Sequence, residues 1–186
     1  MKTVRSLSFL VILIGIAIPY VSSIETDLEL NASNGWIEAS SAIIGMDHKD
    51  IVSSLDEGLR AEIFFQFKIY RVTSGFFSVF GDWLVMEKKP SYIAYKDFFL
   101  DEYIIETSLN ERYSFNDVSD FIDHFLRITD FKLVHTESLP VYDECYILAR
   151  VSVMPVKLEP PLHIIEIFSS IGRTTKWAES PVPLKD

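Results

Sequence analysis

The stretch that most constrains this chain is residues 58–71, GLRAEIFFQFKIYR, in which apolar and polar side chains alternate. A two-residue period places successive side chains on opposite faces of an extended strand. The odd positions form one continuous apolar face: Leu59, Ala61, Ile63, Phe65, Phe67 and Ile69. Phe64 and Tyr70 interrupt the polar face, which indicates that a second layer or neighbouring rings partly cover it. We therefore predict a long central strand with one face against the core.

Short strand-like runs separated by turn residues fill much of the remaining chain. Two of them, 26–32 and 36–44, flank Asn34-Gly35, a pair that tolerates the positive φ of a tight hairpin turn. Further strands are expected over 82–88, 92–99, 102–107, 131–136 and 142–157. The order of these elements predicts a mainly β (α+β) fold, an antiparallel two-layer β-sandwich with two or three short helices.

Helical spacing is confined to a few segments. Asp50 is a candidate cap for a first helix, and Gly58 suits its exit. Ser114 or Asn116 is a candidate cap for a second helix over 114–128. The buried positions expected for the two helices are Ile51, Leu55 and Leu59 in the first and Val118, Phe121, Ile122 and Phe125 in the second. A third short helix or turn is expected around 164–168.

Residues 1–23 have the pattern of a secretory signal peptide. Lys2 and Arg5 precede an apolar run from Leu7 to Ile18, and Pro19 ends that run. Val21 and the small Ser23 then suit cleavage after Ser23. We predict removal of this leader and a single exported, periplasmic β-rich domain over residues 24–186. The alternative is an uncleaved membrane tether, because the uncharged span 6–24 is nearly long enough to cross a bilayer.

Charge and cysteine content exclude several classes of protein. The chain has 17 basic and 27 acidic residues, a net charge of −10. Cleavage after Ser23 removes Lys2 and Arg5, which leaves 15 basic and 27 acidic residues, or −12. A nucleic-acid partner is therefore not expected, and contact with an anionic membrane surface is disfavoured. Cys145 is the single cysteine. It permits no internal disulfide, and its alternating surroundings predict a small buried apolar residue rather than a reactive thiol.

An apolar loop follows the central strand. Between Gly75 and Trp83 the sequence holds Phe76, Phe77 and Phe80. We favour a loop that folds back over the core, because exposed apolar clusters are uncommon on soluble monomers. The alternative is an exposed tip that touches a ligand, a partner or a lipid surface. Phe76, Phe77, Phe80 and Trp83 are then the candidate partner contacts.

Chemistry-bearing motifs are scarce. The sequence has no nucleophile elbow, P-loop, dinucleotide fingerprint or H-E-x-x-H motif. Two polar clusters are candidates for a metal-binding or catalytic site. The first is Asp47, His48 and Asp50 before the first helix, and the second is Asp117, Asp120, His124 and Arg127 on the second helix. We interpret the first as cap and loop groups and the second as a solvated helix face. No catalytic residue, cofactor or metal is expected.

The order of these segments resembles a known family. The leader, the Asn-Gly hairpin, residues 51–59 leading into a strand that ends Ile69-Tyr70-Arg71, the strands between 92 and 105, the 114–126 helix and a closing tryptophan are similar to the bacterial domain-of-unknown-function family 4390. The resemblance implies export and a single domain, and it supplies no activity or site residues. Members often carry tryptophans and basic residues after the Tyr-Arg pair, where this chain has Gly75 to Trp83.

Three functional hypotheses follow. The first is a non-catalytic exported envelope protein, a periplasmic accessory module that binds a partner protein or ligand through sheet edges and the 75–83 loop. The second is a hydrolase or metal-dependent enzyme, which requires His48 or His124 within reach of carboxylates inside a pocket. The third keeps the leader uncut as a membrane tether. We favour the first, because the sequence offers no catalytic constellation.

Overall fold

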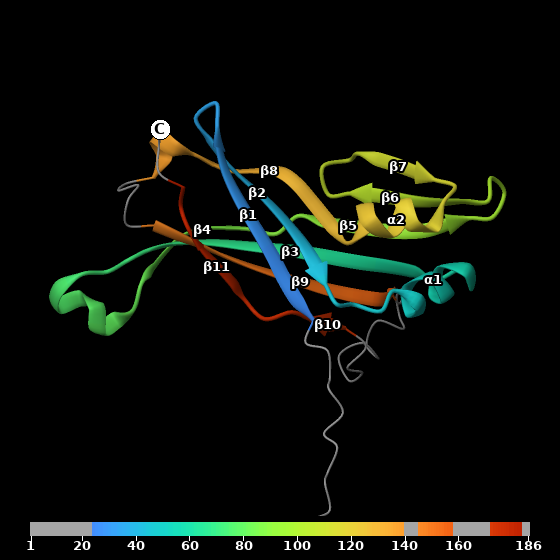
Figure 1. Cartoon of the computed structure of the whole chain (residues 1–186), viewed down its shortest axis with the longest axis horizontal. Helices are drawn as coiled ribbons and strands as arrows, with labels where there is room; N and C mark the ends of the chain where they lie inside the picture. Colours follow the sequence, from blue (N-terminus) through green and yellow to red (C-terminus); the bar gives the residue numbers. More distant parts are fainter. Residues whose placement is uncertain (1–23, 140–144, 158–171, 184–186) are drawn as a thin grey trace, which may run out of the picture.

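The computed structural model of the chain describes residues 24–139, 145–157 and 172–183 (Figure 1). The predicted signal peptide, its alternative role as a tether and the short helix around 164–168 lie outside these residues. In the described part, two antiparallel sheets and a few short helices confirm the predicted β-rich sandwich.

The smaller sheet has three strands in the order β1-β2-β8. Their bounds are β1 Glu25–Ser33, β2 Trp36–Ile44 and β8 Arg127–His135. The larger sheet has the order β10-β9-β3-β5-β6-β7, with β11 beside β9 and β4 beside β3. Its strands are β3 Arg60–Arg71, β4 Trp83–Lys88, β5 Ser91–Asp97, β6 Glu102–Thr107, β7 Arg112–Phe115, β9 Cys145–Lys157, β10 Arg173–Thr174 and β11 Ala178–Pro181.

The predicted central strand is the centre of the larger sheet. Along one side β3 pairs with β9, and along the other it pairs first with β5 and then with β4. The apolar side chains at its odd positions 61–69 are at most 1% exposed. Phe67 stacks on Phe131 of β8 with ring centroids 5.8 Å apart, so this face meets the smaller sheet. The alternation therefore predicted the core correctly.

The Asn-Gly hairpin is also confirmed. Asn34 and Gly35 have φ of 50° and 76°, and Ser33 pairs directly with Trp36 across the two-residue turn. A side chain at Gly35 would place its Cβ 3.1 Å from Nε2 of His135. Both the backbone conformation and the neighbouring strand therefore require glycine here. Cys145, at the start of β9, is 5% exposed, which confirms the prediction of a buried residue.

Two α-helices and two 3₁₀ helices complete the described fold. They are α1 Lys49–Asp56, α2 Val118–Phe125, η1 Gly75–Phe80 and η2 Thr136–Ser138. The predicted caps were wrong. Asp117 caps α2, because its Oδ1 accepts hydrogen bonds from the backbone N–H of Ser119 and Asp120, and Ser114 belongs to β7. His48 occupies the cap position of α1, while Asp50 lies in its first turn.

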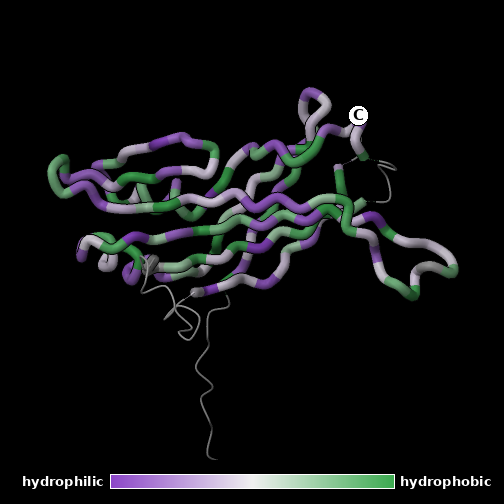
Figure 2. The backbone as a smooth tube through the Cα atoms, turned by 180° about the vertical axis from the view of Figure 1, so that it is seen from behind, coloured by the Kyte–Doolittle hydropathy of each residue, from purple (hydrophilic) through white to green (hydrophobic). Residues whose placement is uncertain are grey.

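The two ends of the larger sheet differ in what they carry. In Figures 1 and 2 the η1 loop projects from one end, whereas α1, α2, β7 and the β5–β6 loop lie at the other. Figure 2 shows apolar residues along the projecting loop. The η1 loop and the helices α1 and α2 therefore lie at opposite ends of the molecule.

Candidate functional site

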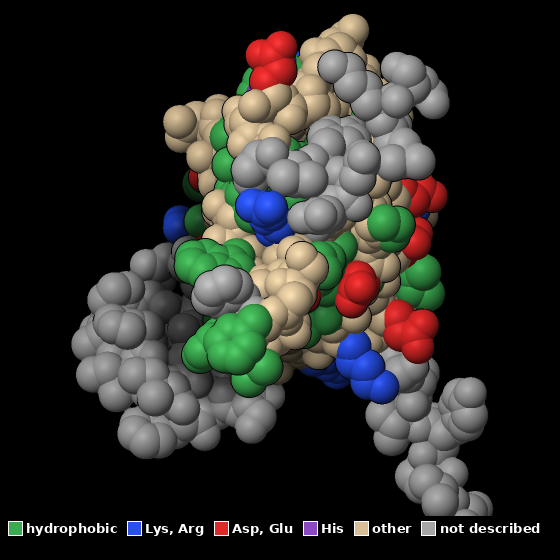
Figure 3. Space-filling view, turned by 90° about the vertical axis from the view of Figure 1, so that its left-hand side faces the viewer, with side chains coloured by type: hydrophobic (Ala, Val, Ile, Leu, Met, Phe, Trp, Pro, Cys, Tyr) green, Lys and Arg blue, Asp and Glu red, His purple; other side chains and the backbone are tan. Residues whose placement is uncertain are grey.

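The loop around η1 exposes a cluster of large apolar side chains. We call it the apolar tip, and its members are Val72, Phe76, Val79, Phe80, Trp83 and Leu84. Phe76 is 83% exposed, Phe80 78% and Trp83 68%. Figure 3 shows apolar side chains gathered at this end of the molecule. The expectation that this loop folds back over the core is therefore wrong, and the loop is exposed. Contact of the tip with a ligand, a partner or a lipid surface stays a prediction.

Position within the fold explains the exposure. The loop joins β3 to β4 beyond the point where the two strands pair, and in Figure 1 none of the other described strands or helices lies beneath it. A Cβ built on Gly75 or Gly81 would meet no other atom within 4 Å. Both glycines have positive φ, which allows the chain to leave β3 and enter β4 sharply. Phe77 belongs to η1, but its side chain lies outside the described part of the structure.

The base of the tip is fixed by Asp82. Its Oδ1 accepts a hydrogen bond from the backbone N–H of Thr73 at 2.9 Å, and its Oδ2 accepts one from the hydroxyl of Tyr146 at 2.9 Å. Burial, together with the hydrogen bond to Asp82, raises the pKa of Tyr146 to about 12. The Tyr146 ring also stacks on Tyr70 of β3 at 5.6 Å. Asp82 thus links the two ends of the loop to each other and joins the loop to β9.

Hydrogen bonds within η1 maintain its shape. The hydroxyl of Ser78 donates to the carbonyl of Gly75 at 2.9 Å, and the N–H of Gly81 donates to the carbonyl of Ser78 at 3.1 Å. These two bonds satisfy the Ser78 hydroxyl and the Gly81 N–H within the turn, while the side chains of Phe76 and Phe80 are exposed. A preformed loop of this kind loses less conformational entropy on binding than a loop that orders only in the complex.

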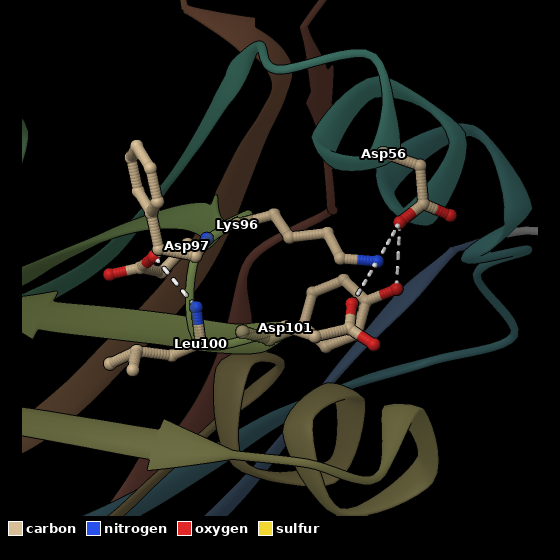
Figure 4. Close-up of polar contacts among 7 residues, drawn as sticks. Asp56, Lys96, Asp97, Leu100 and Asp101 are labelled. Atoms are coloured by element: carbon tan, nitrogen blue, oxygen red, sulfur yellow. Dashed lines mark hydrogen bonds and ion pairs between the residues drawn. The ribbon is translucent and has the colours of Figure 1, made fainter.

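A polar cluster lies at the opposite end, between α1 and the β5–β6 hairpin (Figure 4). Nζ of Lys96 is 3.0 Å from Oδ1 of Asp56 and 3.1 Å from Oδ1 of Asp101. The hydroxyl of Tyr103 donates to the same Asp56 oxygen at 2.8 Å. Hydrogen bonding to the two carboxylates raises the pKa of Lys96 above its ordinary value, and Lys96 and then Tyr103 lower that of Asp56. A lysine that stays protonated cannot act as a nucleophile or a base. We therefore interpret this cluster as a structural link between α1 and the hairpin.

The hairpin turn beside this cluster exposes Phe98, Phe99 and Leu100. We predicted a strand as far as residue 99, but β5 ends at Asp97. The reason is local, because Oδ1 of Asp97 accepts hydrogen bonds from the N–H groups of Phe99 and Leu100, at 2.9 and 3.2 Å, and turns the chain (Figure 4). The exposed Phe-Phe-Leu turn was missed at the sequence level, since an aromatic run is also typical of a strand.

In the second polar cluster Asp117, Asp120 and Arg127 are exposed, as interpreted, but His124 is not. His124 of α2 is half-buried and packs against the rings of Tyr92, Tyr113 and Phe115, with centroids 6.4, 4.5 and 5.2 Å away. With neighbouring charged residues these rings line a hollow of about 500 Å³, which we call the His124 pocket. Our interpretation was wrong for His124, because β7 folds over this side of α2.

The pKa values of the residues in the His124 pocket follow from its aromatic lining. Burial lowers the pKa of His124 below its ordinary value, and the charge of Glu111 opposes part of this change. Burial also raises the pKa of Tyr92 to about 12, with a contribution from Tyr113 and Glu111. The hydroxyl of Tyr113 donates to Oε2 of Glu111 at 3.1 Å. At neutral pH the pocket therefore holds a neutral imidazole and two neutral phenols.

The first polar cluster consists of cap and loop groups, as predicted. Oδ1 of Asp47 accepts from the N–H of Lys49 at 3.1 Å, and Oδ2 of Asp50 pairs with Arg173 at 2.8 Å. His48 is exposed. Among the described residues, no three His, Cys, Asp or Glu side chains come close enough to hold a metal ion. In the same part of the chain, no helix is both long and apolar enough to cross a bilayer.

Comparison with known proteins assigns no relative to this fold. No protein-family model matches the chain, and no curated protein or solved structure matches it either. The resemblance to family 4390 stays a prediction. The apolar tip and the His124 pocket are therefore the two candidate sites for function.

Proposed function

We propose that this chain is a non-catalytic exported module of the cell envelope that binds a partner protein through the apolar tip. The observation that carries the proposal is the exposure of Phe76, Phe80 and Trp83 on a loop that is held in shape from below. Large aromatic side chains at the centre of an interface supply most of its binding energy. Exposed apolar clusters on soluble proteins are typical of such interfaces.

The energetics support a protein partner of ordinary affinity. Fully burying one Phe side chain contributes roughly 1.5–3 kcal/mol. Burial of Phe76, Phe80 and Trp83 in a matching cleft then contributes about 6 kcal/mol, to which Val79 and the rim residues add. The pre-shaped loop lowers the ordering cost that association must otherwise overcome. The tip thus serves as the centre of an interface, with polar strand ends around it as the rim.

Charge favours a protein over a lipid surface. Peripheral membrane loops combine apolar side chains with lysines or arginines that contact headgroups. Between Val72 and Met86 the sequence has no lysine or arginine, and its single charge, Asp82, is used inside the loop. The net charge of the chain is −10. A projecting tip without basic residues fits an apolar cleft in a partner better than an anionic bilayer.

Site-specific photo-crosslinking tests this proposal. A benzophenone amino acid is placed at Phe80, and as a matched control at Phe99, which is fully exposed at the other end of the molecule. We expect one discrete protein adduct from position 80 in envelope preparations and none from position 99. The captured protein is then purified and titrated against the chain and its Phe80→Ser variant, which we expect to bind about 30-fold more weakly.

Three results would overturn the proposal. One is crosslinking from position 80 to lipid alone, which would make the tip a membrane anchor. Another is the same adducts from positions 80 and 99, which would indicate nonspecific contact. The third is equal affinity of the purified partner for the chain and for Phe80→Ser.

The hydrolase alternative rests on His124 alone, because His48 lies on the exposed start of α1. Asp120, Asp123 and Glu111 line the same pocket as His124. The ring contacts of His124 are with aromatic side chains, however, and no carboxylate of the described residues hydrogen-bonds to the imidazole, as orientation of a catalytic base requires. A binding role for this pocket agrees better with these contacts.

A further inference from the structure

The His124 pocket combines aromatic walls with an excess of negative charge. Its rings come from three elements: Tyr92 from β5, Tyr113 and Phe115 from β7, and His124 from α2. Its volume of about 500 Å³ lies within the range of small-molecule sites. Helix α2 and strand β7, which contribute to its lining, lie at the opposite end of the molecule from the η1 loop (Figures 1 and 2). A role for this pocket is therefore independent of the proposed partner surface.

The charged groups of the pocket are unbalanced. Four carboxylates line it, from Glu111, Asp120, Asp123 and Asp130, against the single guanidinium of Arg127. Four negative charges and one positive charge leave −3. A concave surface with one predominant sign of charge concentrates ions of the opposite sign. An anionic ligand is therefore disfavoured here, and a cation is favoured.

The aromatic rings narrow the class of cation. The faces of tyrosine and phenylalanine attract ammonium groups through the ring quadrupole, and aromatic cages bind quaternary ammonium ligands in this way. A bare metal ion would instead need several oxygen or nitrogen ligands converging on one point. No such group occurs among the described residues. Rings and carboxylates together suit a cation that has apolar bulk around its charge.

We infer that the His124 pocket binds a small organic cation, with its ammonium group against the Tyr113 and Phe115 rings and within the field of Glu111 and Asp123. Glu111 is already oriented, because the Tyr113 hydroxyl donates to its Oε2 at 3.1 Å. Since burial lowers the pKa of His124, the imidazole is neutral at pH 7.5 and does not repel the ligand. Arg127 of β8 is the one basic side chain among the described residues that line the pocket.

The test compares two probes of the same shape, choline and its uncharged isostere 3,3-dimethylbutan-1-ol. Each is titrated into the full chain at pH 7.5, and the amide NMR signals of Tyr113 and His124 are followed. We expect choline to shift these signals in a saturable manner and to bind about tenfold more tightly than the isostere. The shifts caused by choline are expected to weaken as salt is added, because the carboxylates are close to solvent.

Variants separate the pocket from nonspecific attraction by an acidic protein. We expect Tyr113→Leu and the double variant Glu111→Gln/Asp123→Asn each to weaken choline binding at least about tenfold. Glu106→Gln is the matched control, because this carboxylate accepts a hydrogen bond from Tyr95 and lies outside the pocket. It is expected to bind choline like the parent chain, and so is Phe80→Ser in the apolar tip.

Two outcomes would overturn the inference. Equal binding of choline and its isostere would remove the role of charge. Unchanged choline binding in Tyr113→Leu and in the double variant would remove the pocket. Urea unfolding of each variant distinguishes loss of the site from loss of the fold. Because Tyr113 and the two carboxylates are exposed, we expect unfolding midpoints close to that of the parent.

Discussion

Replacing Asp82 by alanine releases the apolar tip from the sheet while leaving its aromatic side chains in place. The carboxylate accepts one hydrogen bond from the Thr73 N–H and one from the Tyr146 hydroxyl, each at 2.9 Å. Asp82 is exposed, so each bond contributes about 1 kcal/mol net. We therefore expect the free energy of opening the loop to fall by about 2 kcal/mol, which corresponds to roughly 30-fold faster opening-limited exchange.

Hydrogen exchange measures this effect residue by residue. In Asp82→Ala the amides of Thr73 and Gly81 are expected to exchange roughly 30-fold faster, while those of β3 and β9 are unchanged. Asp82→Asn is the matched control, because its amide oxygen still accepts from Thr73. We expect an intermediate increase for this variant. Unchanged exchange of Thr73 in Asp82→Ala would refute the claim that Asp82 fixes the tip.

The Tyr146 phenol gives an independent readout of the same change. Its pKa of about 12 results first from burial and then from Asp82. In Asp82→Ala the pKa of Tyr146 is expected to fall toward 10 without reaching it, because the contribution of burial remains. In the parent chain the folded state keeps this proton at a pH where the unfolded state releases it. Stability is therefore lost as the pH rises from about 10 to 12. NMR titration of labelled tyrosine in the parent chain and in Asp82→Ala tests whether the pKa of Tyr146 falls as expected.

Three further predictions concern the core, the polar cluster and the pocket. Phe65→Ala deletes a fully buried ring and is expected to lower the free energy of urea unfolding by about 3–5 kcal/mol; a loss below 1 kcal/mol contradicts the central position of β3. Tyr103→Phe removes the hydrogen bond to Asp56 and is expected to cost about 1 kcal/mol in the same assay, whereas an unchanged value would show that the bond is not stabilising. Because the pKa of His124 is lowered, the unfolded chain takes up a proton near pH 6.5 before the folded chain does, and stability is expected to fall as the pH drops further. His124→Gln is expected to reduce this slope between pH 7.5 and 5, and an identical slope contradicts it.

Local patterns sufficed to predict the parts of the fold that depend on few residues. The period of β3 follows from five apolar side chains that need the same face. The hairpin at Asn34-Gly35 follows from positive φ at two adjacent positions. Helix α2 was found from its apolar stripe, although its cap was misplaced because Ser114, Asn116 and Asp117 are all suitable cap residues.

The features that were missed depend on distant contacts. Whether Phe76 and Phe80 are covered depends on what lies beyond the end of β3, which local sequence does not specify. The short strand β11 has no alternating pattern and forms because its backbone pairs with the edge of β9. His124 appeared to lie on a solvated helix face because the rings that surround it come from β5 and β7. Pockets of this kind are assembled by topology and not by one segment.

Cysteine labelling tests the central claim most directly, because the only native cysteine, Cys145, is buried. In the variant Phe80→Cys, the new thiol is expected to react with a maleimide nearly as fast as in the urea-unfolded chain. Saturation with the crosslinked partner is expected to slow that reaction at least about tenfold. Slow labelling of the chain alone would show that the tip is covered by its own core. Labelling at the same rate with and without the partner would show that the tip is not the binding surface.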